Sequence, residues 1–157
     1  MSYYTNNRQL INKLAINTGT TAVPVYVDLC SATERTINFD MDTQDFSVFC
    51  DALKRHVTTG ANVSIETTIK LDAENTGVQT LLANIHALIK DGTIAQFNNV
   101  MIQFGLLSGM TNSTLEYTTY NATANMAIES LGGAAEDVSE FAVTFTLNGT
   151  AQTAASV

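Results

Sequence analysis

The sequence predicts a mainly β fold with one long flanking α-helix, arranged as an antiparallel β-sandwich or an open barrel. Two observations indicate this fold class. Most of the chain alternates apolar and polar residues with period two, as half-buried strands do, and a single stretch, residues 76–92, has helical spacing instead. With 157 residues, 45% of them hydrophobic, the chain is long enough for one core. We therefore expect a single domain over residues 1–157.

The first part of the chain has weak periodicity up to about residue 20. We expect residues 1–20 to form an N-terminal arm or a leading strand. Residues 23–29 then alternate and predict a strand with its valines and Leu29 inward. Because Pro24 has no N–H to donate, this strand begins there or lies at a sheet edge. A second strand is predicted over residues 33–41, with Ile37, Phe39 and Met41 on the inner face.

The next segment departs from strand periodicity. Phe46, Phe49, Cys50 and Leu53 lie three or four residues apart, which predicts a short helix between Thr43 and His56. Residues 58–60 are expected to turn. Residues 61–72 alternate again and predict a strand that leads into the long helix.

The helix at residues 76–92 is the clearest helical pattern. Asn75 or Thr76 can cap its first turn, and Gly92 supplies a left-handed stop. We expect Asn84 and Lys90 to point outward. The residues expected to pack on the sheets are Leu81, Leu82, Ile85 and Leu88.

Three more strands are predicted after the helix. The first covers residues 94–106, and the second covers residues 115–130 after a turn or protruding loop at 108–114. The third, after a turn at 132–137, is the alternation that begins at Phe141 and ends at Leu147. Residues 148–157 are expected to form a polar C-terminal tail.

The composition argues against several functional classes. Fifteen acidic and seven basic residues give a net charge of −8, the opposite of a nucleic-acid reader. No apolar run reaches the roughly 18 residues of a membrane span, and no secretory signal pattern is present. Cys30 and Cys50 are therefore expected to be reduced and buried.

No motif for catalysis or metal binding emerges from the titratable residues. Cys30, Cys50, His56 and His86 could supply four zinc ligands, but their spacing matches no zinc finger. There is no nucleophile elbow and no glycine-rich phosphate loop. We expect no catalytic residues, no metal and no cofactor.

Three segments carry a resemblance to a known family: ERTINFDMDTQDF, then GVQTLLANIHALIKDG, then FAVTFTLNGTA. Their order and spacing resemble the major tail tube protein of long-tailed, siphovirus-type bacteriophages. The resemblance implies the tail-tube fold and a structural virion protein of the tail, made in the host bacterial cytoplasm. It also implies hexameric rings of this chain that stack into a tube, enclose the tape-measure protein and conduct DNA without binding it specifically.

The polar faces of two predicted strands are candidates for the channel wall of such a tube. If the sheets close into a ring, one polar face must line the channel, because the apolar side is needed for the core. The alternative is that these residues face bulk solvent. The candidate lumen-facing residues are Glu66, Thr68, Lys70, Thr119, Asn121, Thr123 and Asn125.

Two other functional classes share this strand pattern. One is a ligand- or carbohydrate-binding β-sandwich module, although such modules usually display aromatic platforms and this chain has no Trp and five Tyr. The other is an enzyme acting on a small molecule. Ordered rings or tubes would favour the structural class, and a sugar-array hit from a strict monomer would favour the binding module.

Overall fold

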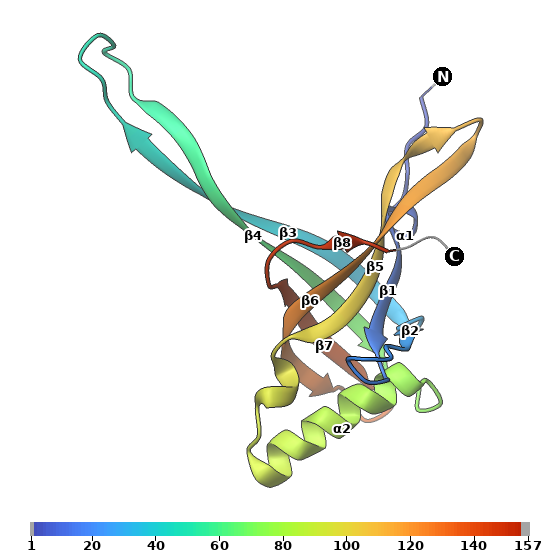
Figure 1. Ribbon diagram of the computed structural model, residues 1–157. Helices are drawn as coiled ribbons and strands as arrows, with labels where there is room; N and C mark the ends of the chain where they lie inside the picture. Colours follow the sequence, from blue (N-terminus) through green and yellow to red (C-terminus); the bar gives the residue numbers. More distant parts are fainter. Residues whose placement is uncertain (1, 155–157) are drawn as a thin grey trace.

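An eight-stranded antiparallel sheet, curled into an open barrel, forms the body of the protein (Figure 1). The computed structural model describes residues 2–154. The strands run in the order β2-β1-β5-β6-β7-β4-β3, and β8 pairs with β6 off this path. The predicted fold class, mainly β with one long helix, is confirmed. The strands are β1 (Ile11–Asn17), β2 (Tyr26–Asp28), β3 (Ala32–Phe46), β4 (Arg55–Lys70), β5 (Val100–Thr111), β6 (Thr114–Gly132), β7 (Glu140–Leu147) and β8 (Gln152–Thr153), and the helices are α1 (Asn7–Leu10), α2 (Thr76–Asp91) and the 3₁₀ turn η1 (Ala95–Phe97).

The core lies on the inner face of this curled sheet. Alternation places Ile65 and Ile69 of β4 inward, next to Phe141 and Phe145 of β7, and all four are fully buried. Thr67 lies between the two isoleucines on the same face and is also buried. Its hydroxyl donates to the Glu34 carbonyl at 2.8 Å, which satisfies the buried polar group.

The two ends of the sheet meet at Arg35 on β3. Its guanidinium donates to the carbonyls of Ile11 and Leu29, both at 3.1 Å, and lies 3.3 Å from the Asp28 carboxylate. The side chain is largely buried, so these charge-assisted bonds join β3 to the β1–β2 end of the sheet. Arg35 therefore closes the seam of the barrel.

Replacing this arginine is expected to weaken the barrel. Arg35→Met keeps an unbranched apolar stem and removes the bonds across the seam, which should lower the free energy of unfolding by about 2–3 kcal/mol. Arg8→Met, at an exposed position, is the control and should change it by less than about 0.5 kcal/mol. Urea denaturation measures the stability of both variants. Equal midpoints for Arg35→Met and Arg8→Met would show that Arg35 does not stabilise the seam.

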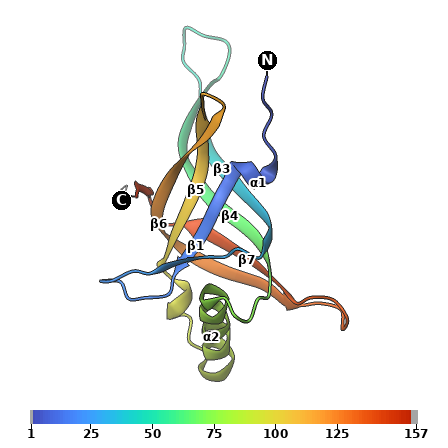
Figure 2. The same ribbon diagram turned by 90° about the vertical axis from the view of Figure 1, so that its right-hand side faces the viewer.

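Helix α2 closes one end of the barrel, and two long hairpins project from the opposite end (Figures 1 and 2). Asn75 caps the helix by accepting from the Gly77 and Val78 amides, and Gly92 ends it with φ 66°. Both terminal signals are thus where the sequence placed them.

The predicted packing stripe of α2 holds only for its first three turns. Leu81 and Ile85 are buried in the core and Leu82 is partly buried against it. The prediction for Leu88 is wrong, because this side chain is 40% exposed. The core stops near Ile85, so the last turn of the helix extends beyond the strands that could cover it. Lys90 is exposed, as expected, whereas Asn84 is partly buried.

Truncating the stripe at its centre is expected to cost stability. Ile85→Ala removes buried methyl groups and leaves a cavity, with an expected loss of about 2–5 kcal/mol. Ile89→Ala, one turn later and 77% exposed, is the matched control and should lose no more than about 0.5 kcal/mol. Thermal and chemical unfolding measure both; a small loss for Ile85→Ala would show that the helix does not dock through this residue.

Part of the predicted N-terminal segment is a β-strand of the barrel. Residues Ile11–Asn17 form β1, which lies between β2 and β5 and buries Leu14 and Ile16. The leading-strand alternative therefore describes residues 11–17. The strand predicted at residues 23–29 shrinks to Tyr26–Asp28 at the sheet edge, since Val23 and Val25 are exposed in the preceding loop. Its position at the edge agrees with the proline that precedes it.

The short helix predicted between Thr43 and His56 is wrong, and so is the turn at 58–60. Strand β3 continues to Phe46 and β4 begins at Arg55, with register pairs from Ala32–Ile69 to Phe46–Arg55. The apolar residues with helical spacing line no core, because all of them are exposed. Figure 1 shows the resulting hairpin as a two-stranded ribbon that leaves the barrel.

Smaller differences concern turns, cysteines and the tail. Strands β5 and β6 continue to a tight turn at Asn112 and Ser113, both with positive φ, so the predicted loop at 108–114 is mostly strand. Cys30 and Cys50 are free, as expected, but exposed rather than buried. The predicted polar tail contains β8, which pairs with β6. Its last residues, 155–157, lie outside the described part of the chain.

Candidate assembly surfaces

The seven residues predicted to face a channel all lie on the outer, polar face of the barrel. Pairing shows this, because directly opposite residues share a face of the sheet. One row runs from Ser64 through Thr146 to Asn125, and a neighbouring row runs from Thr36 through Glu66 to Thr144. The candidates Glu66, Thr68 and Lys70 on β4 are thereby joined across β7 to Thr119, Asn121, Thr123 and Asn125 on β6. Their place in a channel stays a prediction.

Amide side chains form a hydrogen-bonded network on this face. Gln103 donates to Asn121 at 2.8 Å, and Asn148 donates to Asn125 at 2.8 Å and to Asn99 at 3.1 Å. Neutral amides of this kind present polar atoms without fixed charge. The network therefore lines this part of β5 and β6 with polar side chains that carry no charge.

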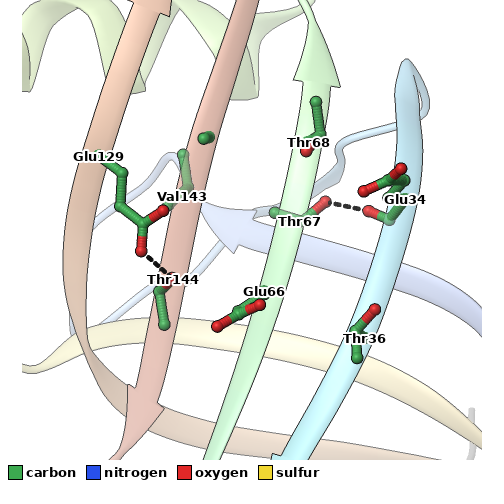
Figure 3. Close-up of a pocket in the computed structure, with 9 residues that line it drawn as sticks. Glu34, Thr36, Glu66, Thr67, Thr68, Glu129, Val143 and Thr144 are labelled. Carbon is green, nitrogen blue, oxygen red and sulfur yellow. Dashed lines mark hydrogen bonds between the residues drawn. The ribbon is translucent and has the colours of Figure 1, made fainter.

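The charged groups of the same face are mostly acidic. Lys70 contacts the Glu140 carboxylate, and Lys13 donates to Gln103, so both lysines have partners. Glu34, Glu66 and Glu129 surround a shallow hollow of about 90 Å³ (Figure 3). Within residues 2–154, no Lys or Arg forms a salt bridge with these three carboxylates. A face with this charge pattern repels a polyanion rather than holding it.

This hollow is too small to be a ligand pocket, since small-molecule sites typically have about 300–1,000 Å³. The four residues considered as zinc ligands are also apart in the fold: Cys30 follows β2, Cys50 is at the hairpin tip, His56 is in β4 and His86 is on α2. Among residues 2–154, no group of three or more His, Cys, Asp or Glu side chains is placed to hold a metal ion. In the same range, no helix has the length and apolar character of a membrane span.

A second surface is the projecting part of the β3–β4 hairpin, residues 39–63, which we call the arm. Strand β7 pairs with β4 only from Ser64 to Lys70, so both edges of the arm lack a strand neighbour. The apolar inner face of the barrel continues onto the arm through the pairs Phe39–Val63 and Met41–Ala61. The exposed large apolar side chains of the arm are Phe39, Met41, Phe46, Val48, Phe49, Leu53 and Val57.

Sequence reasoning missed the arm, although a signal was present. The alternation through Phe39 and Met41 continues beyond the predicted strand end, and Val57, Thr58 and Thr59 form a β-branched run typical of strands. Both signals favour strands on either side of residues 47–54. The helical spacing of the four apolar residues in this region masked them.

A third surface is a groove beside α2, at the end of the barrel opposite the arm. It measures about 520 Å³ and lies between α2, the loop after β1 and the segment around η1. Its walls include Leu81 and Asn84 of α2, Thr20 of the loop, and Gln96 and Met101. The Gln96 amide donates to the Asn84 carbonyl at 3.2 Å, which fixes one wall to the helix. We call this the α2 groove.

Comparisons with known proteins place the fold among tail and tube components. No protein-family model matches the chain, and no curated protein matches its sequence. A chain from the tail of an empty gene transfer agent particle, refined with C6 symmetry, superposes with a TM-score of 0.60 at 11% identity, covering 97% of this chain and 100% of that one. A chain from the anti-feeding prophage cap, which terminates a tube, gives 0.55 at 13% identity, with 98% and 94% covered. A chain from the sheath-tube complex of an extracellular contractile injection system gives 0.51 at 13% identity, with 90% and 89% covered.

Proposed function

We propose that this chain is a structural subunit that assembles with copies of itself into stacked rings, forming the tail tube of a phage-like particle. The observation that carries the proposal is the arm. A two-stranded ribbon with unpaired edges is marginally stable on its own in water, and exposed apolar patches of this kind mark protein–protein contacts. A neighbouring copy would cover both the apolar side chains and the open edges.

The similar solved structures support the same reading at the level of fold. The three structures described above come from a tail, a tube cap and a sheath-tube complex, and one was refined with C6 symmetry, which supports hexameric rings. The siphovirus-type tail rests on the resemblance of the three sequence segments described above. A structure from a contractile injection system is also among the neighbours.

The proposed location and partners follow from this role. The subunit would be made in the bacterial cytoplasm and incorporated into the tail of the particle. The tube would enclose the tape-measure protein and afterwards let DNA pass. The acidic and amide-rich outer face described above suits a channel wall, because adhesion of DNA depends mainly on Lys and Arg contacts to phosphates.

Electron microscopy and sedimentation of the concentrated protein test the proposal. Rings or tubes are the expected result, with a sedimentation profile that depends on protein concentration. A protein that remains a monomer at high concentration, with and without a crowding agent, would contradict it. A sugar-array hit from that strict monomer would favour a ligand-binding β-sandwich instead.

A further inference from the structure

One asparagine of the amide network is followed directly by a glycine. Asn148 and Gly149 come immediately after β7, at the start of the segment that leads to β8, and they form the only Asn-Gly sequence in the chain. Both residues are exposed. Gly149 has φ 81°, and apart from its chain neighbours no atom lies within 4 Å of the place where a Cβ would be. The space beside this peptide unit is therefore open.

A backbone nitrogen in this position can attack the side chain that precedes it. The glycine nitrogen forms a bond to the asparagine Cγ, the Cγ–Nδ2 bond breaks, and ammonia leaves with the proton of the backbone nitrogen. Because both groups belong to one chain, the step is intramolecular, and its product is a cyclic succinimide. Water then opens the ring at one of its two carbonyl carbons, which gives aspartate or isoaspartate. The net reaction exchanges ammonia for water and needs no enzyme, metal or oxidant.

The attacking nitrogen of Gly149 has no hydrogen-bond partner. Within residues 2–154, no hydrogen bond uses the Gly149 N–H as donor. The chain contains one comparable acidic sequence, Asp91-Gly92, whose carboxyl could form the same ring. There the Gly92 N–H donates to the Leu88 carbonyl at 2.9 Å as part of the α2 cap. Asn148 is therefore the residue at which both the sequence and the backbone geometry permit the attack.

The side chain of Asn148 is held through the atom that must leave. Its Nδ2 donates to Asn125 Oδ1 at 2.8 Å and to Asn99 Oδ1 at 3.1 Å. Both bonds are lost when Nδ2 leaves as ammonia, so they oppose the reaction in the folded chain. The amide network therefore slows a reaction that the local sequence favours.

We propose that Asn148 is a site of spontaneous deamidation and that its bonds to Asn99 and Asn125 restrain the reaction. Carboxylate oxygens only accept hydrogen bonds, so conversion removes the Asn148 donor from both partner oxygens and adds a negative charge to the neutral network. Isoaspartate also places an extra carbon in the main chain before β8, whose pairing with Tyr120 and Asn121 depends on the length of this segment. Conversion should therefore loosen the end of the chain. The inference goes beyond the proposed function and does not depend on it.

Incubation of the full chain in mildly alkaline buffer tests the site, because loss of the N–H proton promotes the attack. Peptide mapping by mass spectrometry, with enzymatic labelling of isoaspartate, should show conversion at Asn148 before any other asparagine. Asn148→Gln is the matched control: it keeps the amide but is one methylene longer, so the ring would be larger, and it should stay unconverted over the same period. Earlier conversion of another asparagine would overturn the proposal. So would an intact Asn148 in the folded chain at a time when the urea-unfolded chain is fully converted.

Removing the two acceptors tests the restraint. In the double variant Asn99→Gly/Asn125→Ala, glycine suits the φ of 54° at position 99, and conversion of Asn148 should be about tenfold faster. Asn38→Ala removes another exposed asparagine, on β3, and should leave the rate as in the wild-type chain. Circular dichroism and thermal unfolding check the fold. If the double variant does not fold, Asn125→Ala alone should give a smaller increase. A wild-type rate in the folded variant that lacks the acceptors would show that the network does not restrain the reaction.

Discussion

A variant in which an Asn-Gly turn replaces residues 40–62 of the arm is expected to fold normally and to lose tube assembly. Phe39 and Val63 are directly paired, so two residues can join them in a type I′ turn that suits the twist of the strands. None of residues 40–62 is buried, and the free energy of unfolding should change by no more than about 1 kcal/mol. Assembly should be abolished, because the shortened chain lacks the apolar tip and the unpaired edges.

Electron microscopy at the highest attainable concentration, with thermal unfolding to confirm the fold, makes this measurement. Val138→Ser is the control: Val138 is 60% exposed in the β6–β7 turn, so it also removes an exposed apolar side chain, but outside the arm. It should assemble as the wild-type chain does. Tubes formed by the shortened chain would show that the arm makes no essential contact between copies.

Local patterns were sufficient to predict helix α2 and strand β7, whose neighbours lie within the same chain. Helix α2 has its cap at Asn75 and its stop at Gly92, and both act through backbone groups within one turn. Strand β7 alternates strictly from Phe141, and both of its sides are paired within the barrel. At these positions propensity, periodicity and burial agree, so periodicity alone indicated the correct structure.

The largest failure occurs where the chain leaves the barrel. The inference that Phe46, Phe49 and Leu53 form a helical face assumed that apolar residues must find a core in their own domain. In the structure they are exposed on the arm, so their spacing carries no information about local structure. Leu88 fails for a related reason: it continues the helical stripe past the point where strands cover it. Both errors involve apolar residues that are exposed outside the core of the barrel.

The candidate channel face could be predicted only in part. Strand alternation was enough to place Glu66 and Asn121 opposite the core, and register then showed that β4 and β6 share this face through β7. Whether a polar face lines a channel depends on the position of other copies. That information lies in the interfaces between copies rather than in the periodicity of one chain.

If this face lines the proposed channel, lysines introduced on it are expected to make passing DNA adhere to the channel wall. Asn121→Lys/Thr123→Lys adds two cations per copy to a surface whose own Lys13 and Lys70 already have partners. In a hexameric ring this becomes a dozen new charges at one level, repeated along the tube. Each lysine that contacts a phosphate should steepen the plot of log affinity against log salt by about 0.9. DNA ejection should therefore slow strongly at low salt and recover as salt rises.

The experiment compares tube assembly and DNA ejection at low and high salt for particles carrying the variant. Ala83→Lys/His86→Lys is the control, because it places two lysines on an exposed part of α2, outside the polar face. It should eject DNA at the wild-type rate at every salt concentration. Thr123 is exposed and Asn121 only half-buried, so both lysines can extend into solvent and assembly should be preserved. Normal assembly with unchanged ejection at low salt would show that Asn121 and Thr123 do not line the channel and that this face is exposed to bulk solvent.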